Sequence, residues 1–351
     1  MAKRTVRIAV SLILMVALLA LFLWNVNFKE VGRALESASL GWLLLAGCLA
    51  LLSYWLRAIR IILLLRPVGK VRHSTANLST AVGYAAMSLL PARMGDLVRP
   101  VIISRRDTLP LSAALASILT ERLFDMWTII VGFLIFSLAP PTMNLSSEAL
   151  RILDLLELTG WILGIGVVTG SLVLLGLFRY QERFVHALTW PARRFVPRWE
   201  DNFRAFFNHF MEGLKVIQRP RDLLLTLGAS VLVWWTIYFQ MKLTLLAFGI
   251  VLPLRASYLL VMLSVAGLAI PTPGGAGGFH WAIQKGLTAF FGVELNLATG
   301  IAIAYHALCF VPITIVGLLC LPVLGLSLRE TARLAEETSA GTGETGEQKE
   351  G

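Results

Sequence analysis

Charged side chains are scarce in this sequence. Aspartate, glutamate, lysine and arginine together make up 15% of its 351 residues, whereas hydrophobic residues make up 57%. The mean hydropathy is +0.74. Because water-soluble domains contain roughly 25% charged residues, this composition excludes a soluble globular protein and indicates a membrane protein with several spans.

Cysteine is also scarce, with three in the chain. Cys48, Cys309 and Cys320 all lie in apolar segments, where cysteine behaves as a small hydrophobic residue. Their positions match neither the spacing of metal ligands nor a disulfide framework. We therefore expect no bound metal and no cofactor.

Acidic residues are outnumbered by basic ones, 21 to 31, which gives a net charge of +10. A basic balance can indicate nucleic-acid binding, but here the basic residues cluster between apolar segments, as in cytoplasmic loops. We therefore expect no nucleic-acid partner. Residues 1–7 are basic and precede an apolar run without a small-residue cleavage site, so we expect an uncleaved first helix with a cytoplasmic N-terminus.

The apolar segments fall into two groups. Six are long enough to cross about 30 Å of hydrocarbon as a helix. Residues 76–105 and 256–291 instead each contain an apolar helix, a break at proline and glycine, and a second short helix. The six long segments are 6–24, 41–65, 111–139, 158–178, 221–249 and 297–326.

The distribution of basic residues predicts the direction of each segment. If residues 76–91 crossed the membrane, the arginine-rich segment 179–221 would lie outside, against the positive-inside rule. The alternative is that residues 76–105 enter from the cytoplasm and turn back, and that residues 256–291 enter from outside and turn back. In that arrangement, 22 of the 31 lysines and arginines lie inside, five lie outside and four lie within the membrane. We predict an all-α polytopic membrane protein of the cell (inner) membrane, with six transmembrane helices, two re-entrant helical hairpins and both termini in the cytoplasm.

The order of these elements repeats along the chain. Two spans, a hairpin and a third span occur in residues 1–140 and again in residues 155–330. Because three is an odd number, the second half is inverted relative to the first, and inverted repeats with broken helices near the midplane are typical of transporters. We predict one transmembrane domain over residues 1–330 and a disordered cytoplasmic tail at 331–351.

The tips of the two hairpins are candidate anion sites. Non-helical backbone at membrane depth is tolerated only where it is buried in protein or lines a wet cavity. Free N–H groups at a helix start favour an anion, glycines allow close approach, and guanidinium groups fit phosphate. The candidate residues are Arg93, Asp96 and Arg99 at the first tip and Thr272, Pro273, Gly274, Gly275, Gly277 and His280 at the second.

Ionisable residues also occur inside the long segment 111–139. Glu121 and Asp125 share a helix face, and Arg122 can pair with Asp125 at i and i+3. Charges at the centre of a membrane helix cost roughly 2.5–3.5 kcal/mol each, so they usually face the bundle interior with a partner. We expect Glu121 or Asp125 to hold Arg93 or Arg99; the alternative is a purely structural set of ion pairs beside simple helix kinks.

Two other features are expected to face the inner membrane surface. Arg57 and Arg60, in segment 41–65, are expected to extend their head groups to that surface. The stretch 201–218 is amphipathic, with phenylalanines on one face, and is expected to lie on the inner leaflet.

The motifs LLPARMGDLVRPVIISRR, ERLFD and PTPGGAGGF, in this order, resemble the lysylphosphatidylglycerol synthase transmembrane region, a flippase-like family, over residues 10–325. In the family's best-known members, a cytoplasmic aminoacyl-transferase domain follows the membrane domain, which moves the aminoacylated phospholipid between leaflets. Residues 326–351 are too few for such a domain, so the resemblance implies lipid translocation without aminoacyl transfer. The matching positions are Pro91, Arg93, Gly95, Arg99, Glu121, Arg122, Asp125, Pro273, Gly274, Gly275 and Gly277.

Three positions depart from the family's usual residues. Asp96 stands where glutamate is usual, His280 where an acid follows the glycine motif, and His306 where arginine is usual. The last two suggest that an acid–base pair is replaced by two imidazoles, so we predict that His280 and His306 lie close together. Two neutral imidazoles can share a hydrogen bond, whereas two imidazolium ions repel, so acidification is expected to loosen the second hairpin. The alternative is two unrelated core histidines.

These features favour a lipid flippase or scramblase, and not an enzyme, that moves a phospholipid or a polyprenyl-phosphate-linked lipid between leaflets. The expected partner is a membrane lipid with an anionic head group, and a separate lipid-modifying enzyme is a further candidate. Two alternatives remain open. One is a membrane enzyme acting on lipid-linked substrates, although the sequence offers no nucleophile–base pair or metal cluster. The other is a non-transporting subunit of an envelope assembly.

Overall fold

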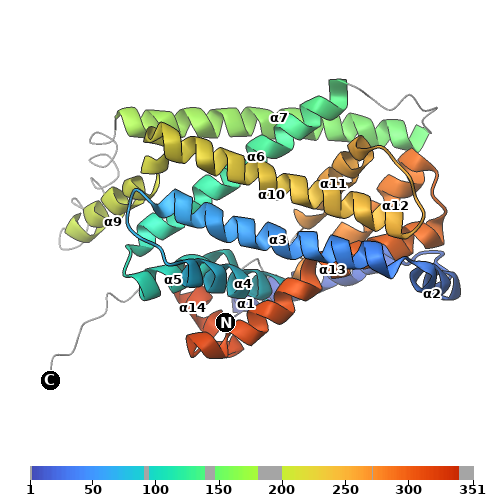
Figure 1. Ribbon diagram of the computed structural model, residues 1–351, viewed down its shortest axis with the longest axis horizontal. Coiled ribbons are helices and arrows are strands. Elements are labelled where there is room, and N and C mark those ends of the chain that lie inside the picture. Colours follow the sequence, from blue (N-terminus) through green and yellow to red (C-terminus); the bar gives the residue numbers. More distant parts are fainter. Residues whose placement is uncertain (1, 91–94, 139–146, 181–199, 271, 340–351) are drawn as a thin grey trace.

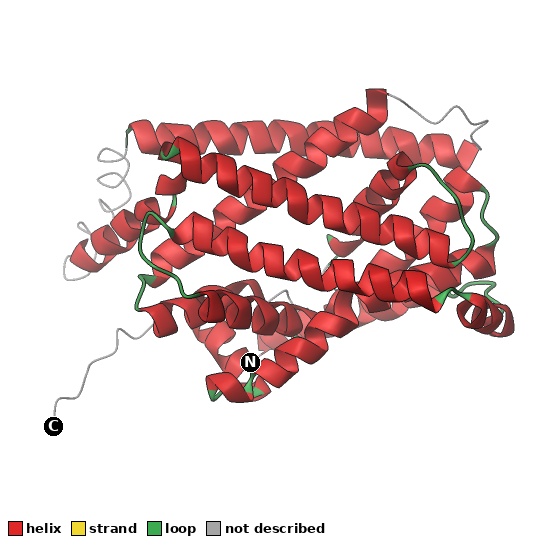
Figure 2. Ribbon diagram, in the orientation of Figure 1, coloured by secondary structure: helices red, strands yellow, loops and turns green. Residues whose placement is uncertain are grey.

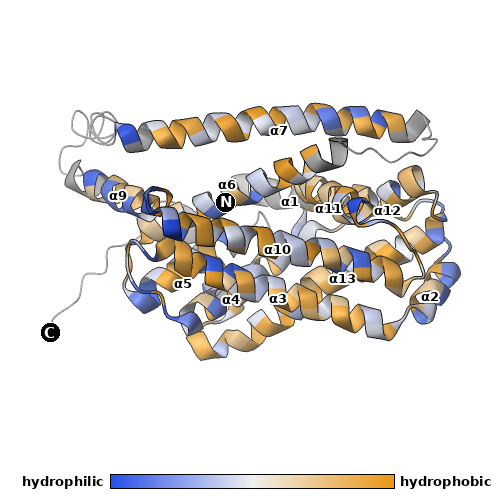
Figure 3. Ribbon diagram, turned by 45° about the horizontal axis from the view of Figure 1, so that its top comes forward, coloured by the Kyte–Doolittle hydropathy of each residue, from blue (hydrophilic) through white to orange (hydrophobic). Residues whose placement is uncertain are grey.

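The computed structural model describes residues 2–90, 95–138, 147–180, 200–270 and 272–339 (Figure 1). Every regular element among these residues is a helix, and none is a strand (Figure 2). Hydrophobic residues dominate along the long helices, whereas hydrophilic residues concentrate near the two ends, for example at α2 (Phe28–Ser37) and α9 (Glu200–Gly213) (Figure 3). The chain therefore has the all-α architecture of a polytopic membrane protein, as its composition predicts.

Six long helices coincide with the six predicted spans. They are α1 (Ala2–Phe22), α3 (Leu40–Leu65), α6 (Leu111–Leu138), α7 (Ser147–Arg179), α10 (Pro220–Ala247) and α13 (Leu295–Cys320). Four segments among the described residues are each long and apolar enough to cross a membrane. They are α3, α10, residues 150–176 of α7, and α13 with the turn after it. Helix α6 is as long but carries three charged residues at its centre, and the apolar part described for α1 is shorter, residues 12–22.

Each broken region forms two helices that pack against each other. The first contains α4 (His73–Leu89) and α5 (Gly95–Asp107). The second contains α11 (Leu254–Leu268), the 3₁₀ turn η4 (Pro273–Gly275) and α12 (Gly278–Phe291). Helix α4 ends where Leu90 takes the extended backbone that a residue before proline prefers.

A pair of glycines brings the two helices of each region together. In the first region, a Cβ on Gly95 would overlap the carbonyl oxygen of Gly83 and lie 2.6 Å from the backbone nitrogen of Met87. In the second, a Cβ on Gly267 would overlap the carbonyl of Gly278. Each second helix begins at one of these glycines. Helix α5 begins at Gly95, 12 residues after Gly83, and α12 begins at Gly278, 11 residues after Gly267. Each broken region therefore contains one close contact between glycines of its two helices.

The two ends of the first region are held together. Arg72, just before α4, donates from Nε to Asp107 Oδ1 at 2.6 Å and from its backbone N–H to Asp107 Oδ2 at 3.0 Å. The hydroxyl of Thr75 donates to the same carboxylate at 3.1 Å. Arg66, at the end of α3, pairs nearby with Asp222 at the start of α10 at 3.0 Å. The α4–α5 pair therefore starts and finishes at one end of the bundle, on the left in Figure 1.

The opposite end is closed by α2. The backbone N–H of Asn27 donates to Asn296 Oδ1 of α13 at 2.8 Å, and the Glu294 carboxylate caps the start of α13. Two further short 3₁₀ turns are η3 (Lys215–Gln218) after α9 and η5 (Pro322–Leu324) after α13. Helix α9 packs on α6, with Met211 and Leu214 buried.

Helix α14 (Leu328–Ser339) corrects one prediction. Residues 331–339, assigned to a disordered tail from their composition, continue this helix. Ser327 and Glu330 form a capping box, in which each side chain accepts a hydrogen bond from the other's backbone N–H. Thr331 and Leu334 are buried, because α14 packs on α4 and α5. The rest of the predicted tail, residues 340–351, lies outside the described residues.

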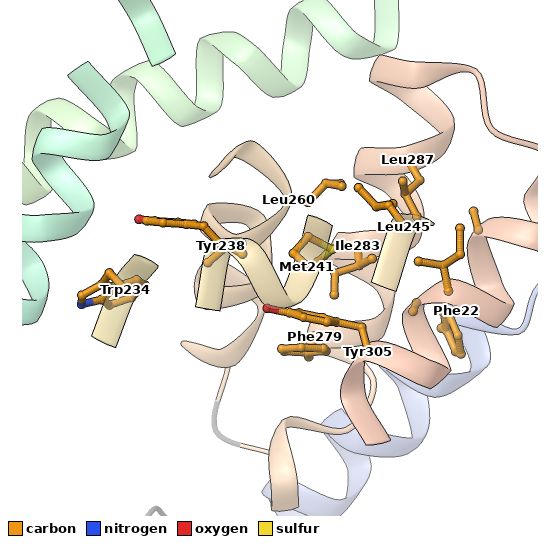
Figure 4. Packing of buried hydrophobic residues seen from close by; sticks show 14 residues of the cluster. Phe22, Trp234, Tyr238, Met241, Leu245, Leu260, Phe279, Ile283, Leu287 and Tyr305 are labelled. Carbon is orange, nitrogen blue, oxygen red and sulfur yellow. The ribbon is translucent and has the colours of Figure 1, made fainter. Parts of the chain in front are cut away.

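The largest core cluster lies among α10, α11, α12, α13 and the end of α1 (Figure 4). It includes Phe22 of α1, Tyr238 and Met241 of α10, Ile283 of α12 and Tyr305 of α13, all nearly or fully buried. This packing fixes the second broken region against three long helices and so determines the position of η4.

Candidate functional site

Helix α6 carries two buried carboxylates one turn apart, those of Glu121 and Asp125. Arg60 of α3 lies between them, with Nη2 2.7 Å from Glu121 Oε1 and Nη1 2.6 Å from Asp125 Oδ1. Helix α10 adds Ser230, whose Oγ accepts from Arg60 Nη1 at 3.1 Å, and Trp234, whose Nε1–H donates to Asp125 at 3.0 Å. These bonds join α3, α6 and α10 inside the bundle.

The first broken region adds Arg99 of α5. Its two terminal nitrogens each lie 3.2 Å from a carboxylate oxygen of Glu121, which is the forked geometry of a strong arginine–carboxylate pair. The ring of Tyr84 on α4 faces the guanidinium, with its centre 5.3 Å away. The Arg99 side chain passes over Gly83, where a Cβ would overlap it. Gly83 is therefore required both for helix packing and for the path of this arginine.

Arg57 of α3 is the least neutralised arginine of the cluster. Its Nη1 donates to the Tyr84 hydroxyl at 2.9 Å but lies 3.9 Å from Glu121 and 3.8 Å from Asp125. Its Nε is buried without a hydrogen-bond partner among the described residues, as are those of Arg60 and Arg99. Because neither carboxylate lies within hydrogen-bond distance of Arg57, its guanidinium can bind a further acceptor.

The cluster opens at Arg122 and Asp96. Arg122 of α6 pairs with Asp96 in the first turn of α5 and lies 3.9 Å from Asp125. About a third of the Arg122 side chain, 36%, is exposed, and so is 26% of the Asp96 side chain. The side chains of Arg60 and Arg99 are fully buried. A ligand can therefore reach Arg122 first.

The cluster has an excess of positive charge. Among the described residues, four arginines face three carboxylates, so the fully ionised cluster carries +1. A charge without a counter-charge away from water is costly, and a bound anion removes that cost. The arginines are Arg57, Arg60, Arg99 and Arg122, and the carboxylates are Asp96, Glu121 and Asp125.

The structure corrects part of the predicted site. Arg57 and Arg60 do not extend to the membrane surface; both are buried and bound within the cluster. Glu121 holds Arg99, as predicted, whereas Arg93 lies outside the described residues. The missed residues had a signal, because Arg57 and Arg60 are two charges three positions apart in an apolar helix, where charges usually need partners.

The predicted residues of the second region form a separate group. Gly274, Gly275 and Gly277 have φ values of 58°, 67° and 88°, which glycine adopts without strain. Thr272 precedes η4, and Pro273 is its first residue. The glycines thus produce a tight turn between α11 and α12, although no contact joins this turn directly to Arg99 or Arg122 among the described residues.

His280 and His306 lie close together, as predicted. Their ring centres are 4.2 Å apart. The hydrogen bond differs from the predicted one: His306 Nε2 lies 2.8 Å from the carbonyl oxygen of Gly274. Phe22 of α1 is 5.1 Å from the His280 ring, and Phe310 stacks on His306 at 4.4 Å. The pair therefore ties α13 to the η4 turn in aromatic surroundings.

The two groups meet at the end of α4. A Cβ on Gly274 would lie 3.2 Å from the carbonyl oxygen of Ser88, and α4 packs on η4. Ser88 Oγ donates to the carbonyl of Tyr84 one turn earlier, and Tyr84 in turn contacts Arg57 and Arg99. Among the described residues, no three histidine, cysteine or acidic side chains are grouped so that they could hold a metal ion.

These features define a polytopic helical membrane protein with a buried arginine–carboxylate cluster beside a broken helix pair. The chain belongs to the family of the lysylphosphatidylglycerol synthase transmembrane region, whose model matches residues 6–317. The family predicted from the three motifs is thereby confirmed.

One curated relative is named Glycosyltransferase AglD, from Haloferax volcanii. It is 26% identical over 347 residues, an alignment that covers 90% of this chain and 54% of that protein. The chain therefore spans about half the length of this relative. No solved structure matches the chain.

Proposed function

We propose that the protein moves a phosphate-bearing lipid between the two leaflets of the membrane, as a flippase or scramblase. The proposal is carried by one observation: a cluster with excess positive charge lies among apolar helices and opens at Arg122 and Asp96. A lipid phosphate would replace Asp96 on Arg122, which keeps the guanidinium neutralised while the head group passes. The excess charge at Arg57 would then attract the phosphate further into the cluster.

Membership of a membrane family related to lipid chemistry supports this function. The substrates that fit the site are phospholipids and polyprenyl-phosphate-linked lipids, because both combine a phosphate with hydrocarbon chains. A separate lipid-modifying enzyme that supplies the lipid is a proposed partner.

The proposed arrangement has six transmembrane helices and two re-entrant hairpins in inverted halves. The bond between Arg72 and Asp107 supports a hairpin that enters and leaves at one end. The corresponding glycine pairs support the repeat. We place the end with the arginine-rich segment 179–221 in the cytoplasm of the cell membrane, together with both termini.

Leaflet exchange of a labelled lipid tests the proposal. The full chain would be reconstituted in vesicles with a fluorescent phospholipid or polyprenyl phosphate, and a membrane-impermeant quencher would report the outer leaflet. Loss of a charge-assisted contact of about 1.5–3 kcal/mol weakens binding about ten- to a hundredfold, so Arg122→Gln is expected to slow exchange at limiting lipid by that factor. Arg122→Lys should restore part of the rate, because lysine keeps the charge without the fork.

Arg151→Gln is the matched control, because Arg151 is an exposed arginine near the start of α7. It should leave exchange unchanged. Equal rates for wild type, Arg122→Gln and empty vesicles would refute transport, and equal rates for wild type and Arg122→Gln above that background would refute the role of Arg122.

A second candidate is a membrane enzyme that acts on a lipid-linked sugar. The name of the Haloferax volcanii relative, Glycosyltransferase AglD, favours it. The same vesicles distinguish the two functions, since an enzyme converts a lipid-linked sugar to a new product, whereas a flippase returns the lipid unchanged.

A further inference from the structure

Among the described residues, no direct contact joins the pair of imidazoles beside η4 to the arginine cluster, so the pair requires its own explanation. The rings of His280 and His306 are tilted by 32° at 4.2 Å. They are surrounded by the rings of Phe22, Phe279 and Phe310. Their described contacts include no carboxylate, so no counter-ion holds either imidazole in its charged form.

The hydrogen bonds of the pair leave a place for one proton. His306 Nε2 lies 2.8 Å from the Gly274 carbonyl, and because a carbonyl only accepts, this nitrogen carries a hydrogen. A neutral His306 therefore has a lone pair on Nδ1. His280 Nδ1 is buried and has no partner among the described residues. The pair can accept one proton, but a second would place two cations in contact.

The elements around the pair bring few other titratable groups. On α13, Tyr305 stacks on Phe279, and Cys309 accepts from Gln240 of α10 at 3.4 Å. On α12, Lys285 follows His280 by more than one helical turn. The contacts from α1, η4 and α4 come from apolar side chains, backbone and a serine among the described residues. A change of charge at this place therefore belongs to the two imidazoles.

The pair is connected to the arginine cluster through neighbouring groups. His306 binds Gly274, which packs on Ser88 at the end of α4. Ser88 bonds to Tyr84, whose hydroxyl accepts from Arg57 at 2.9 Å. Movement of η4 therefore changes the support of the residue that orients Arg57.

We propose that His280 and His306 form a proton-binding site, and that protonation of this site is coupled to lipid binding at the arginine cluster. The inference rests on the proposed transport function for its coupling but not for the site itself. A charged imidazolium is costly in aromatic surroundings. Protonation therefore favours a position of η4 in which the imidazolium reaches water. The turn then leaves Ser88, and the phosphate site changes through Tyr84. The proton thereby serves as the coupling ion of lipid transport.

Two measurements on the full chain in vesicles test this site. The first is lipid exchange over about pH 5 to 8, the range in which histidine titrates, with and without a pH gradient. One coupled proton changes the rate by at most about tenfold per pH unit. The variants are His280→Gln and the double variant with His306→Gln, and the control is His73→Gln, an exposed histidine.

The second measurement does not need transport. Thr272→Cys, in a background without other cysteines, reports access of water to η4 through its labelling by a soluble maleimide. Its labelling is normalised at each pH to that of Val251→Cys, an exposed loop residue, which removes the pH dependence of the thiol itself. Labelling of Thr272→Cys is expected to rise on acidification and to lose this response in both His280 variants.

The outcomes separate the proton site from lipid transport. A pH response of Thr272→Cys that the His280 variants abolish supports the proton site even if no lipid is exchanged. A different result overturns the proton site and leaves lipid transport standing. In that result, lipid exchange is independent of pH and of the gradient, and Thr272→Cys labelling does not change with pH. A response that persists in the double variant, or that a metal chelator removes, also overturns it.

Discussion

At the scale of single residues, the arginine cluster contains fully enclosed and partly open members. Arg60 is enclosed and binds Glu121 and Asp125 at 2.7 and 2.6 Å. Removing one partner of a buried ion pair leaves the other charge unpaired, which destabilises a protein by about 3–5 kcal/mol. We expect Arg60→Ala to lower the free energy of unfolding in detergent by about this amount. Arg151→Ala should change it by less than about 0.5 kcal/mol, and equal values for the two variants would contradict the prediction.

Gly83 gives a second test at this scale. A Cβ at this position would overlap the Arg99 side chain, so Gly83→Ala must displace Arg99 from Glu121 or separate α4 from α5. Overpacking of this kind costs about 1–3 kcal/mol. Gly228→Ala on α10 is the matched control, because a Cβ there meets nothing within 4 Å and alanine gains helix propensity of up to about 1 kcal/mol. If the unfolding temperature of Gly83→Ala equals or exceeds that of Gly228→Ala, the close approach between Gly83 and Arg99 is absent.

The cluster also shows how far single residues can be predicted from sequence. Glu121 and Asp125 stand out, because charges at the centre of an apolar helix require partners. Their partner Arg60 was not predicted, since an arginine in a long helix can also extend to the surface. It lies 65 positions from Asp125 and 170 from Ser230. Local periodicity contains no information about pairs so distant in the chain.

At the scale of elements, the first broken region decides the topology. Its two ends are bonded through Arg72 and Asp107, so a re-entrant hairpin should expose the α5–α6 connection on the cytoplasmic side only. We expect Thr108→Cys, an exposed position, to react with an impermeant maleimide only after intact cells are permeabilised. Val251→Cys, in the loop between α10 and α11, should react without permeabilisation. External labelling of Thr108→Cys would exclude the hairpin.

The elements differ in how well the sequence predicts them. The long helices follow from uninterrupted apolar runs, and the breaks follow from Pro91 and from the glycines after Pro273. Helix α14 was missed, because its composition resembles a disordered tail and its apolar contacts with α4 and α5 are tertiary. The capping box at Ser327 and Glu330 was the local signal for its start.

At the scale of the whole molecule, two long helices pack on broken regions that are distant from them in the sequence. Helix α13 packs on α4, where a Cβ on Gly317 would overlap Ala81. Helix α6 packs on α11, where a Cβ on Gly132 would lie 3.3 Å from Tyr258. Helices α3 and α10 lie side by side between them (Figure 1). Helix α7 is the least buried of the four long apolar segments found among the described residues, with 11% of its apolar stretch buried.

A ligand that binds only the folded protein must stabilise the whole molecule. At a free concentration of one hundred times Kd the gain is about 2.7 kcal/mol. We expect a phosphate-bearing lipid to raise the unfolding temperature of the wild-type chain in detergent, because it neutralises the excess charge of the cluster. A diacylglycerol with the same hydrocarbon chains is the matched ligand without phosphate and should have little effect. Arg122→Gln should lose most of the shift, whereas Arg151→Gln should keep it. An equal shift with both lipids would mean that the hydrocarbon chains, and not the phosphate, are what the protein binds.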